Sequence, residues 1–186
     1  MSMVIDFIRE TIHPQHERWD GAVSDLSPEQ IHYHPGVGNH IGFIVWHYVR
    51  TEDNVVQFVF QNRQPPVWLQ GGYDQAFGLP RTAQGTGMPA EEAAGLRLPP
   101  ADQWMAYQRA VWGATDDWLV GVMEADLQRQ VQIKPFGEIP ILTALRQIII
   151  GPARPLDGIV GPGISQVLPR RILPGNGREQ RLKIER

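Results

Sequence analysis

The sequence predicts an all-α protein: an antiparallel four-helix bundle with a long ordered excursion between its second and third helices and an irregular C-terminal tail. Apolar residues recur at helical spacing in four stretches, namely 3–23, 40–60, 100–125 and 140–150. No stretch alternates apolar and polar residues for long enough to predict a convincing sheet. Several amphipathic helices without a convincing sheet are typical of helical bundles.

We expect a long first helix, 3–23, followed by a short helix that precedes the second long one. The first, 3–23, has an apolar face formed by Val4, Phe7, Ile8, Ile12 and Trp19. Pro14 removes a backbone donor, so we expect it to kink this helix or to restart it near His13. Ser27 and Pro28 are a helix-start pair that begins a short helix, and His34-Pro35-Gly36 ends it.

The strongest helical pattern covers 40–60, where we expect Asn39 to be the N-cap. Its apolar stripe has a period of 3.6 residues and consists of Ile41, Ile44, Val45, Tyr48, Val49, Val55, Val56 and Val59. The β-branched residues lower the intrinsic helix propensity slightly. The stripe outweighs that cost because it extends over about 20 residues.

Residues 61–100 contain six glycines and six prolines and therefore form no long regular element. Trp68, Leu69, Tyr73 and Phe77 are too apolar for a solvated linker. We predict a packed excursion with a short helical turn near 89–94. Ordered long loops of this kind often border a cleft.

The third and fourth long helices follow the excursion. Pro99-Pro100 begins the third helix. We expect its three tryptophans, Trp104, Trp112 and Trp118, to lie in the core together with Trp46 of the preceding long helix. Phe136-Gly137 is a turn, and Pro140 begins the fourth helix, which Gly151-Pro152 ends.

Composition narrows the class of protein. The 186 residues suffice for one domain, which we place at 1–165, with a basic tail at 166–186. The absence of cysteine excludes disulfides, thiolate metal sites and cysteine nucleophiles. A net charge of −3 argues against general nucleic-acid binding. Neither a signal peptide nor a membrane span is visible, so we expect a soluble cytoplasmic protein without a membrane partner.

All six histidines lie within the first 47 residues, which is the most informative asymmetry in the sequence. Neutral imidazole is the commonest metal ligand and the usual base near pH 7. His47, inside the apolar stretch 40–60, is either a metal ligand that points into the centre of the bundle or a hydrogen-bonded core histidine. His40 lies two helical turns earlier, about 10.5 Å away along the axis, too far to share one ion with His47. We expect it to support His47 or to cap the helix.

The remaining histidines carry weaker signals. His32 and His34 form a His-x-His pair that suits zinc only if carboxylates approach. His13 and His16 are three residues apart on the first helix, but Pro14 disturbs the turn between them. For both pairs a surface or structural role is the competing interpretation. Glycine-rich phosphate loops, nucleophile elbows and His-Glu-x-x-His motifs are absent from the sequence.

Two segments resemble the DinB/YfiT-like superfamily. The first extends from Leu26-Ser27-Pro28-Glu29-Gln30 to His34-Pro35-Gly36. The second is the run from Ile41 to Asp53, which contains Ile-Gly followed by His47 and Glu52, and Phe136-Gly137-Glu138 resembles a further part of the pattern. The resemblance covers roughly residues 5–165 and implies an up-down-down-up four-helix bundle, often a homodimer.

The resemblance also implies a divalent metal, zinc or nickel, held by three histidines. One of them aligns with His47, and the other two would come from a His-x-x-x-His pair on the fourth helix. Characterised members are thiol-dependent S-transferases, maleylpyruvate isomerases or hydrolases, and many members have no known activity.

The sequence departs from the family pattern at the metal ligands. The two fourth-helix positions are Gly151 and Pro155, and neither has a side chain that binds metal. A single imidazole gives no tight site, because affinity depends on several preorganised ligands. Three explanations stay open: a bundle without metal, ligands recruited elsewhere such as His40, Glu52 or His16, and an altered C-terminal sequence.

Three functions follow from these observations. The first is a metal-dependent transferase or hydrolase with His47 as one ligand. The second is a non-catalytic bundle that binds a small ligand or forms a dimer. The third is an interaction module that uses the basic tail, whose partner binding would be sensitive to salt.

Overall fold

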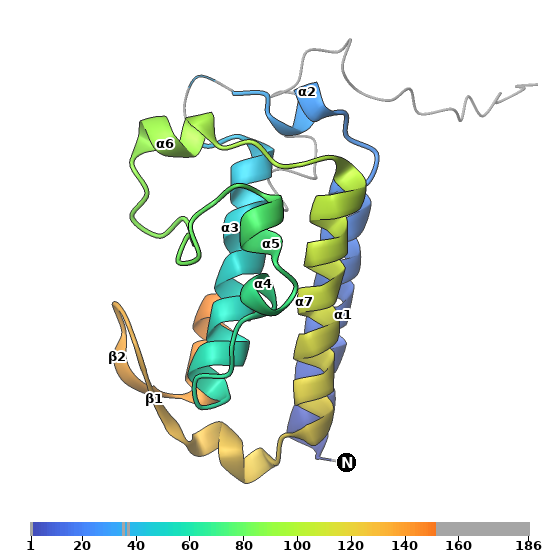
Figure 1. Ribbon diagram of the computed structural model, residues 1–186. Coiled ribbons are helices and arrows are strands. Elements are labelled where there is room, and N and C mark those ends of the chain that lie inside the picture. The colour runs from blue at the N-terminus through green and yellow to red at the C-terminus, as the bar shows by residue number, and fades with distance from the viewer. Residues whose placement is uncertain (1, 35, 37, 152–186) are drawn as a thin grey trace, which may run out of the picture.

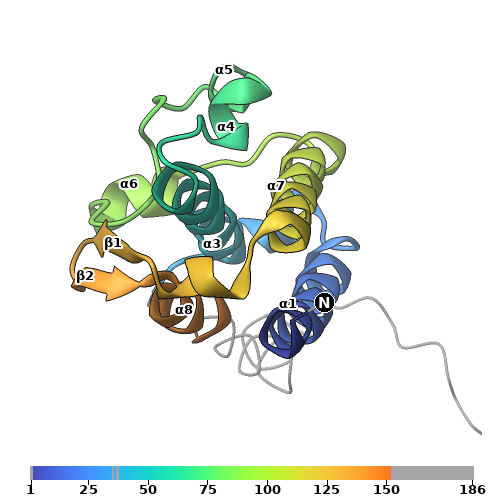
Figure 2. The same ribbon diagram turned by 90° about the horizontal axis from the view of Figure 1, so that it is seen from below.

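The computed structural model describes residues 2–34, 36 and 38–151, and this part of the chain is mostly helical, as predicted. Its long helical segments lie side by side (Figure 1), and Figure 2 views them nearly end-on. They are α1 (Met3–Val23), α3 (Ile41–Asp53) with η1 (Asn54–Phe60), α7 (Ala101–Gly121), and α8 (Ile141–Ala144) with η3 (Leu145–Ile150). The smaller elements are α2 (Pro28–Ile31), α4 (Val67–Gln70), α5 (Tyr73–Ala76), α6 (Ala90–Gly95), η2 (Glu124–Gln128), β1 (Gln130–Ile133) and β2 (Gly137–Pro140). The expected domain end at 165 and the basic tail lie outside the described residues.

Helix α1 continues through Pro14 as one element, so the expected restart near His13 does not occur. Pro14 is exposed, which leaves its missing backbone donor on the solvent side of the helix. The Ser2 side chain caps the helix by accepting a hydrogen bond from the Val4 N–H. The predicted apolar face is buried at Ile8, Ile12 and Trp19, whereas Phe7 is exposed.

The short second helix is present as α2. Ser27 forms a capping box with Gln30, and Pro28 occupies the first turn, as the sequence indicates. The N-cap of α3 is His40 rather than Asn39, because the His40 Nδ1 accepts the Phe43 N–H at 3.1 Å. An imidazole nitrogen thus takes the place of the usual short polar side chain.

The excursion packs against α3 and α7 on the outer side of the helices, and Figure 2 shows its helices α4 and α5 there. Trp68 of α4 is completely buried, and its ring meets the Tyr107 ring of α7 at 5.3 Å. The helical turn expected near 89–94 is α6, whose Ala93 is buried. Large apolar side chains therefore attach this segment to the helices beneath it.

A two-stranded antiparallel sheet is the element that the sequence prediction missed. β1 pairs with β2 in the register Val131↔Ile139, and the predicted turn at Phe136-Gly137 connects the strands. Gly137 adopts a φ of 78°, which favours glycine. Strands of four residues are too short for alternation to distinguish them from a loop.

Two apolar clusters form the core of the described residues. One contains Trp19, Trp46, Trp68, Trp104 and Trp112. The other is mainly aliphatic and includes Ile8, Ile12, Leu119, Leu145 and Ile149. Trp118 is only partly buried and packs against Phe60 at 5.3 Å between ring centroids, so three of the four predicted core tryptophans are fully inside.

Within the described part of the chain, no helix is both long and apolar enough to span a bilayer.

Candidate functional site

A pocket of about 630 Å³ opens beside His47. It lies between α3 with η1, the strand hairpin, η3 and the excursion near residue 84. Its apolar wall includes Trp19, Ile44, Val55, Phe58, Ile133 and Ile148. Its polar wall, besides His47, includes Thr51, Asn54, Gln84, Gln132, Lys134 and Gln147. An apolar pocket of this size with a few polar groups is typical of small-molecule sites.

The His47 ring is fixed on two sides. Its Nδ1 lies 2.5 Å from the main-chain oxygen of Gln84, and its ring stacks on Phe43 with centroids 5.8 Å apart. A carbonyl oxygen only accepts, so the Nδ1 carries the proton and donates. The Nε2 of the neutral ring therefore keeps its lone pair, which is the arrangement required of a metal ligand, a base or a hydrogen-bond acceptor.

Gly85 allows the excursion to approach this ring closely. A Cβ at Gly85 would lie 2.7 Å from the His47 Nδ1, and the glycine adopts a φ of 90°. Both the space and the backbone conformation therefore call for glycine here. The close approach fixes the tautomer of His47.

Arg50 holds the excursion next to His47. Its Nε donates to the Ala83 main-chain oxygen at 2.9 Å, one residue before the carbonyl that contacts His47. Its Nη1 donates to the Asp53 carboxylate at 3.0 Å, and its guanidinium lies over the Trp68 ring at 4.8 Å. Arg50 is almost fully buried, so this arrangement is part of the core.

Asp53 connects three elements through one carboxylate. It accepts hydrogen bonds from the main-chain N–H groups of Val67 and Trp68 and from the Tyr107 hydroxyl, at 2.7 to 2.9 Å. Burial raises the pKa of Asp53, while the Trp68 N–H and the charge of Arg50 act to lower it. Burial, followed by the charge of Asp53, raises the pKa of Tyr107 well above its usual value.

Both π-helical segments of the described chain line the pocket. The segment η1 contributes Asn54, Val55, Phe58 and Val59, and η3 contributes Gln147 and Ile148. π-Helical turns are rare and occur frequently at functional sites. This coincidence supports the pocket as the site of function.

Gly151, one position of the implied metal site, has no side chain and lies against the main chain of its own π-helical turn. A Cβ at Gly151 would lie 2.9 Å from the Arg146 main-chain oxygen, so a histidine there would require the π-helical turn to shift. Pro155, the other fourth-helix position, lies outside the described residues. The residues present around His47 therefore do not fit a three-histidine site.

Side chains recruited from elsewhere do not complete a ligand set either. In the described ranges, no three His, Asp or Glu side chains converge closely enough to hold a metal ion. His40, Glu52 and His16 each have other partners, as follows from their hydrogen bonds.

The ring nitrogens of His40 and His32 form hydrogen bonds with main-chain groups. The His40 Nε2 donates to the Ala93 oxygen at 3.1 Å, while its Nδ1 caps α3. The His32 Nδ1 donates to the Pro28 oxygen, and its Nε2 accepts the Leu98 N–H at 2.9 Å. Burial is the main cause that lowers the pKa of both histidines, with the mutual repulsion of the two rings adding to it for His40. The capping role expected of His40 is confirmed.

The other half of the His-x-His pair is exposed. The His34 Nδ1 accepts the Gly36 N–H at 3.1 Å, a local loop contact. Since both nitrogens of His32 are used by the main chain, this pair does not converge on one point.

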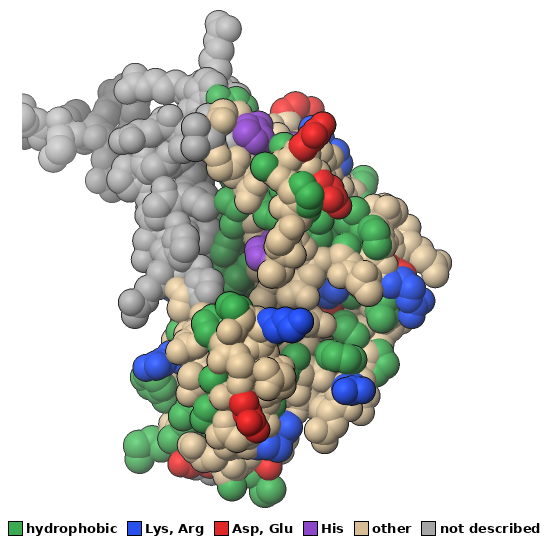
Figure 3. Space-filling view, turned by 90° about the vertical axis from the view of Figure 1, so that its left-hand side faces the viewer, with side chains coloured by type: hydrophobic (Ala, Val, Ile, Leu, Met, Phe, Trp, Pro, Cys, Tyr) green, Lys and Arg blue, Asp and Glu red, His purple; other side chains and the backbone are tan. Residues whose placement is uncertain are grey.

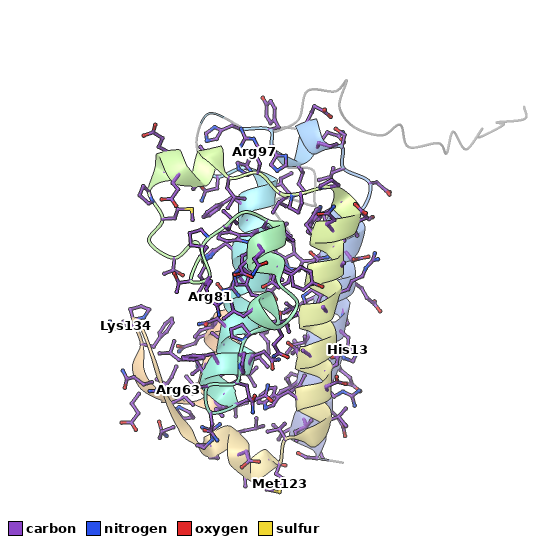
Figure 4. All side chains as sticks on the ribbon, in the orientation of Figure 1. His13, Arg63, Arg81, Arg97, Met123 and Lys134 are labelled. Atoms are coloured by element: carbon purple, nitrogen blue, oxygen red, sulfur yellow. The ribbon has the colours of Figure 1, made fainter. Side chains whose placement is uncertain are left out.

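His13 and His16 diverge in the same way. The His13 Nε2 donates to Asp116 of α7 at 2.6 Å, on the outer side of α1 (Figure 4). The His16 Nε2 donates to the fully buried Glu52 at 3.1 Å, and the Thr115 hydroxyl donates to the same carboxylate at 2.7 Å. Glu52 thus links α1, α3 and α7, a role that the sequence did not reveal.

Several pocket residues have no signal in the sequence. The Gln84 carbonyl is a main-chain group, and Lys134 lies at the tip of the unpredicted hairpin, where Figure 4 shows it. On the face drawn in Figure 3, hydrophobic side chains gather beside a histidine, with a basic side chain below it. Only the glycine pattern around 85, which is typical of tight loops, offered a hint.

Comparison with known proteins gives a family and a fold. The model of the DinB superfamily matches residues 12–150. The chain is also similar to the crystal structure of a conserved protein from Enterococcus faecalis, with 19% identity and a TM-score of 0.67. That similarity covers 84% of this chain and 98% of the other, and at this identity it concerns the fold alone. No curated protein matches the chain.

Proposed function

The chain belongs to the DinB superfamily, and on that premise we propose that it binds a small organic molecule in the pocket beside His47. The observation that carries this proposal is the pocket itself, whose apolar wall surrounds one imidazole with an Nε2 that has no hydrogen-bond partner among the described residues. Its volume of about 630 Å³ lies within the range of ligand sites. The ligand would pack on the aliphatic wall and accept or donate hydrogen bonds at the polar one.

Fluorescence of the neutral dye N-phenyl-1-naphthylamine tests this proposal. We expect saturable binding of one dye per chain, and we expect Ile44→Trp, which fills the half-buried wall of the pocket, to weaken it at least tenfold. Ala106→Trp places the same bulk on the exposed face of α7 and should leave binding unchanged. Equal binding to both variants, or none to the wild type, would overturn the proposal.

A metal-dependent transferase or hydrolase is the second candidate. One observation favours it: the His47 Nδ1 is held by a main-chain carbonyl, as metal-binding histidines commonly are, which directs the Nε2 away from that contact. Against it stands the close approach of Gly151 to the Arg146 oxygen. Zinc or nickel is accordingly a cofactor for this candidate alone.

Elemental analysis separates the two candidates. If the protein only binds a small molecule, we expect less than one tenth of an equivalent of zinc or nickel per chain after purification with added ions, both in wild type and in His47→Ala. About one equivalent in wild type, lost in His47→Ala, would establish the metal-dependent candidate instead.

Two further properties implied by the family belong to the proposal. We infer that the long helical segments form the superfamily's antiparallel four-helix bundle and that the protein is a homodimer. Sedimentation velocity at micromolar concentration would give twice the mass of 21.0 kDa for the dimer and the single mass if the inference is wrong.

A further inference from the structure

The charges around the pocket are one-sided. None of the described residues that line it is an aspartate or glutamate, whereas Lys134 contributes a positive charge and His47 an imidazole. The remaining polar lining residues are neutral amides and hydroxyls. A wall of this composition attracts anions and discriminates against cations.

Lys134 has no neutralising partner in the part of the chain that the structure describes. It lies exposed at the tip of the hairpin, and among the described residues it forms no ion pair with a carboxylate. Lys134 also lines the pocket, so its ammonium group is available to a ligand at this rim. Because water partly surrounds a charge at the rim, its attraction for a ligand anion is weaker than that of a buried charge.

Two buried polar atoms of the same wall also lack partners. The Trp19 Nε1 and the Thr51 Oγ1 find no hydrogen-bond partner within the described structure, although Trp19 is 97% buried. An indole N–H can only donate, so its missing partner must be an acceptor. The indole nitrogens of Trp46, Trp68 and Trp112, which do not line this pocket, also lack partners within the described residues, so the unpaired Trp19 indole is not specific to this site.

We propose that the ligand of this pocket is an organic anion, with an apolar body against Ile44, Val55 and Ile148 and an anionic oxygen group at Lys134. This inference rests on the proposed function, since it names the class of molecule that occupies the same pocket. Carboxylates and sulfonates share the required chemistry, because both present several acceptor oxygens and one negative charge. Cations and purely aliphatic molecules fit the wall less well.

Two dyes with the same ring skeleton test the proposal. 8-Anilinonaphthalene-1-sulfonate is anionic, and N-phenyl-1-naphthylamine is its neutral counterpart. At low salt we expect wild type to bind the anion about fivefold more tightly than the neutral dye, as one contact between unit charges near 4 Å in a solvated setting predicts. This preference should shrink as salt rises to 0.5 M.

Lys134→Gln should remove the preference without changing affinity for the neutral dye, and Lys134→Arg should keep it. Arg63→Gln is the matched control, because it removes one positive charge from an exposed residue that does not line the pocket. A preference that persists in Lys134→Gln, or falls equally in Arg63→Gln, would overturn the anion proposal.

The outcomes also separate this inference from the proposed function. If neither dye binds wild type, the binding function itself is wrong. If both dyes bind equally and Ile44→Trp weakens both, the pocket binds small molecules and only the anionic class is wrong.

Discussion

At the scale of single residues, Gly85 and Glu52 decide how the site is built. Gly85 lets a main-chain carbonyl reach His47, and Glu52 occupies the interior between three helices. Neither role is visible from residue type alone, because glycine is common in loops and glutamate is common on helix surfaces. Each role can be tested against a control residue that lacks the contact in question.

Gly85→Ala should destabilise the protein more than Gly87→Ala. Both glycines have positive φ, at 90° and 73°, so both substitutions incur backbone strain of about 1 kcal/mol. Only at Gly85 does the added Cβ also meet the His47 ring, at 2.7 Å. Urea unfolding should show the larger loss in free energy for Gly85→Ala, and equal losses would contradict the close contact.

Glu52→Ala should cost about 3–5 kcal/mol of unfolding free energy, because it strips the partner from a buried, hydrogen-bonded group. Asp20→Asn, which breaks the exposed pair with Arg109, should cost far less. Denaturant unfolding of both variants gives the comparison. Similar losses for the two would mean that Glu52 is not held as the geometry indicates.

At the scale of elements, imidazole nitrogens replace common capping and turn groups. His40 caps α3, and His32 accepts the N–H of Leu98 at the end of the excursion. Both contacts require an unprotonated nitrogen, so these elements depend on pH in a way that an asparagine or serine cap does not.

Stability should therefore fall as the solution is acidified. Burial holds the pKa of His32 and His40 below the ordinary value of about 6.5, so the unfolded chain takes up protons first. Their contribution is complete above pH of about 6.5 and decreases as pH drops through that value toward the folded pKa.

His40→Asn tests this sign. Asparagine keeps an N-cap acceptor for the Phe43 N–H but does not titrate, so the unfolding free energy should change less between pH 7.5 and 5.5 than in wild type. His34→Asn, at an exposed loop position, should retain the wild-type slope. An unchanged slope in His40→Asn would contradict the argument.

At the scale of the whole molecule, the excursion and the helices form one unit through Asp53. Its carboxylate joins α3 to the start of α4 and to α7, and Arg50 extends the same contacts to residue 83. The pocket wall near Gln84 therefore depends on a carboxylate outside the pocket lining.

Asp53→Ala should lower the unfolding free energy by about 3–5 kcal/mol and increase amide exchange in residues 61–100. The same change should weaken binding of N-phenyl-1-naphthylamine, since the 84 loop loses its attachment. Asp102→Ala, at an exposed position of α7, is the control and should alter none of these. Normal exchange in 61–100 would show that Asp53 does not hold the excursion.

The sequence by itself determined the helical class, the family resemblance and the main helices, while the functional role of His47 stays a prediction. These follow from local rules: apolar periodicity, caps and breakers act over three to seven residues and are written in consecutive side chains. The same rules found His40 as a candidate cap and the turn at 136–137. They predicted Asn39 instead of His40 as the N-cap, and they missed the hairpin because strands of four residues are too short to show a clear alternation.

Only the tertiary structure decided what surrounds His47. Its carbonyl partner lies 37 residues away in sequence. Lys134 lies in the turn of a hairpin whose Val131 and Ile133 pack into the aliphatic cluster. Gly151 is an unsuitable metal-ligand position on two counts, its missing side chain and the carbonyl that crowds it. Long-range packing sets such distances, and packing depends on the simultaneous fit of residues that no local pattern relates.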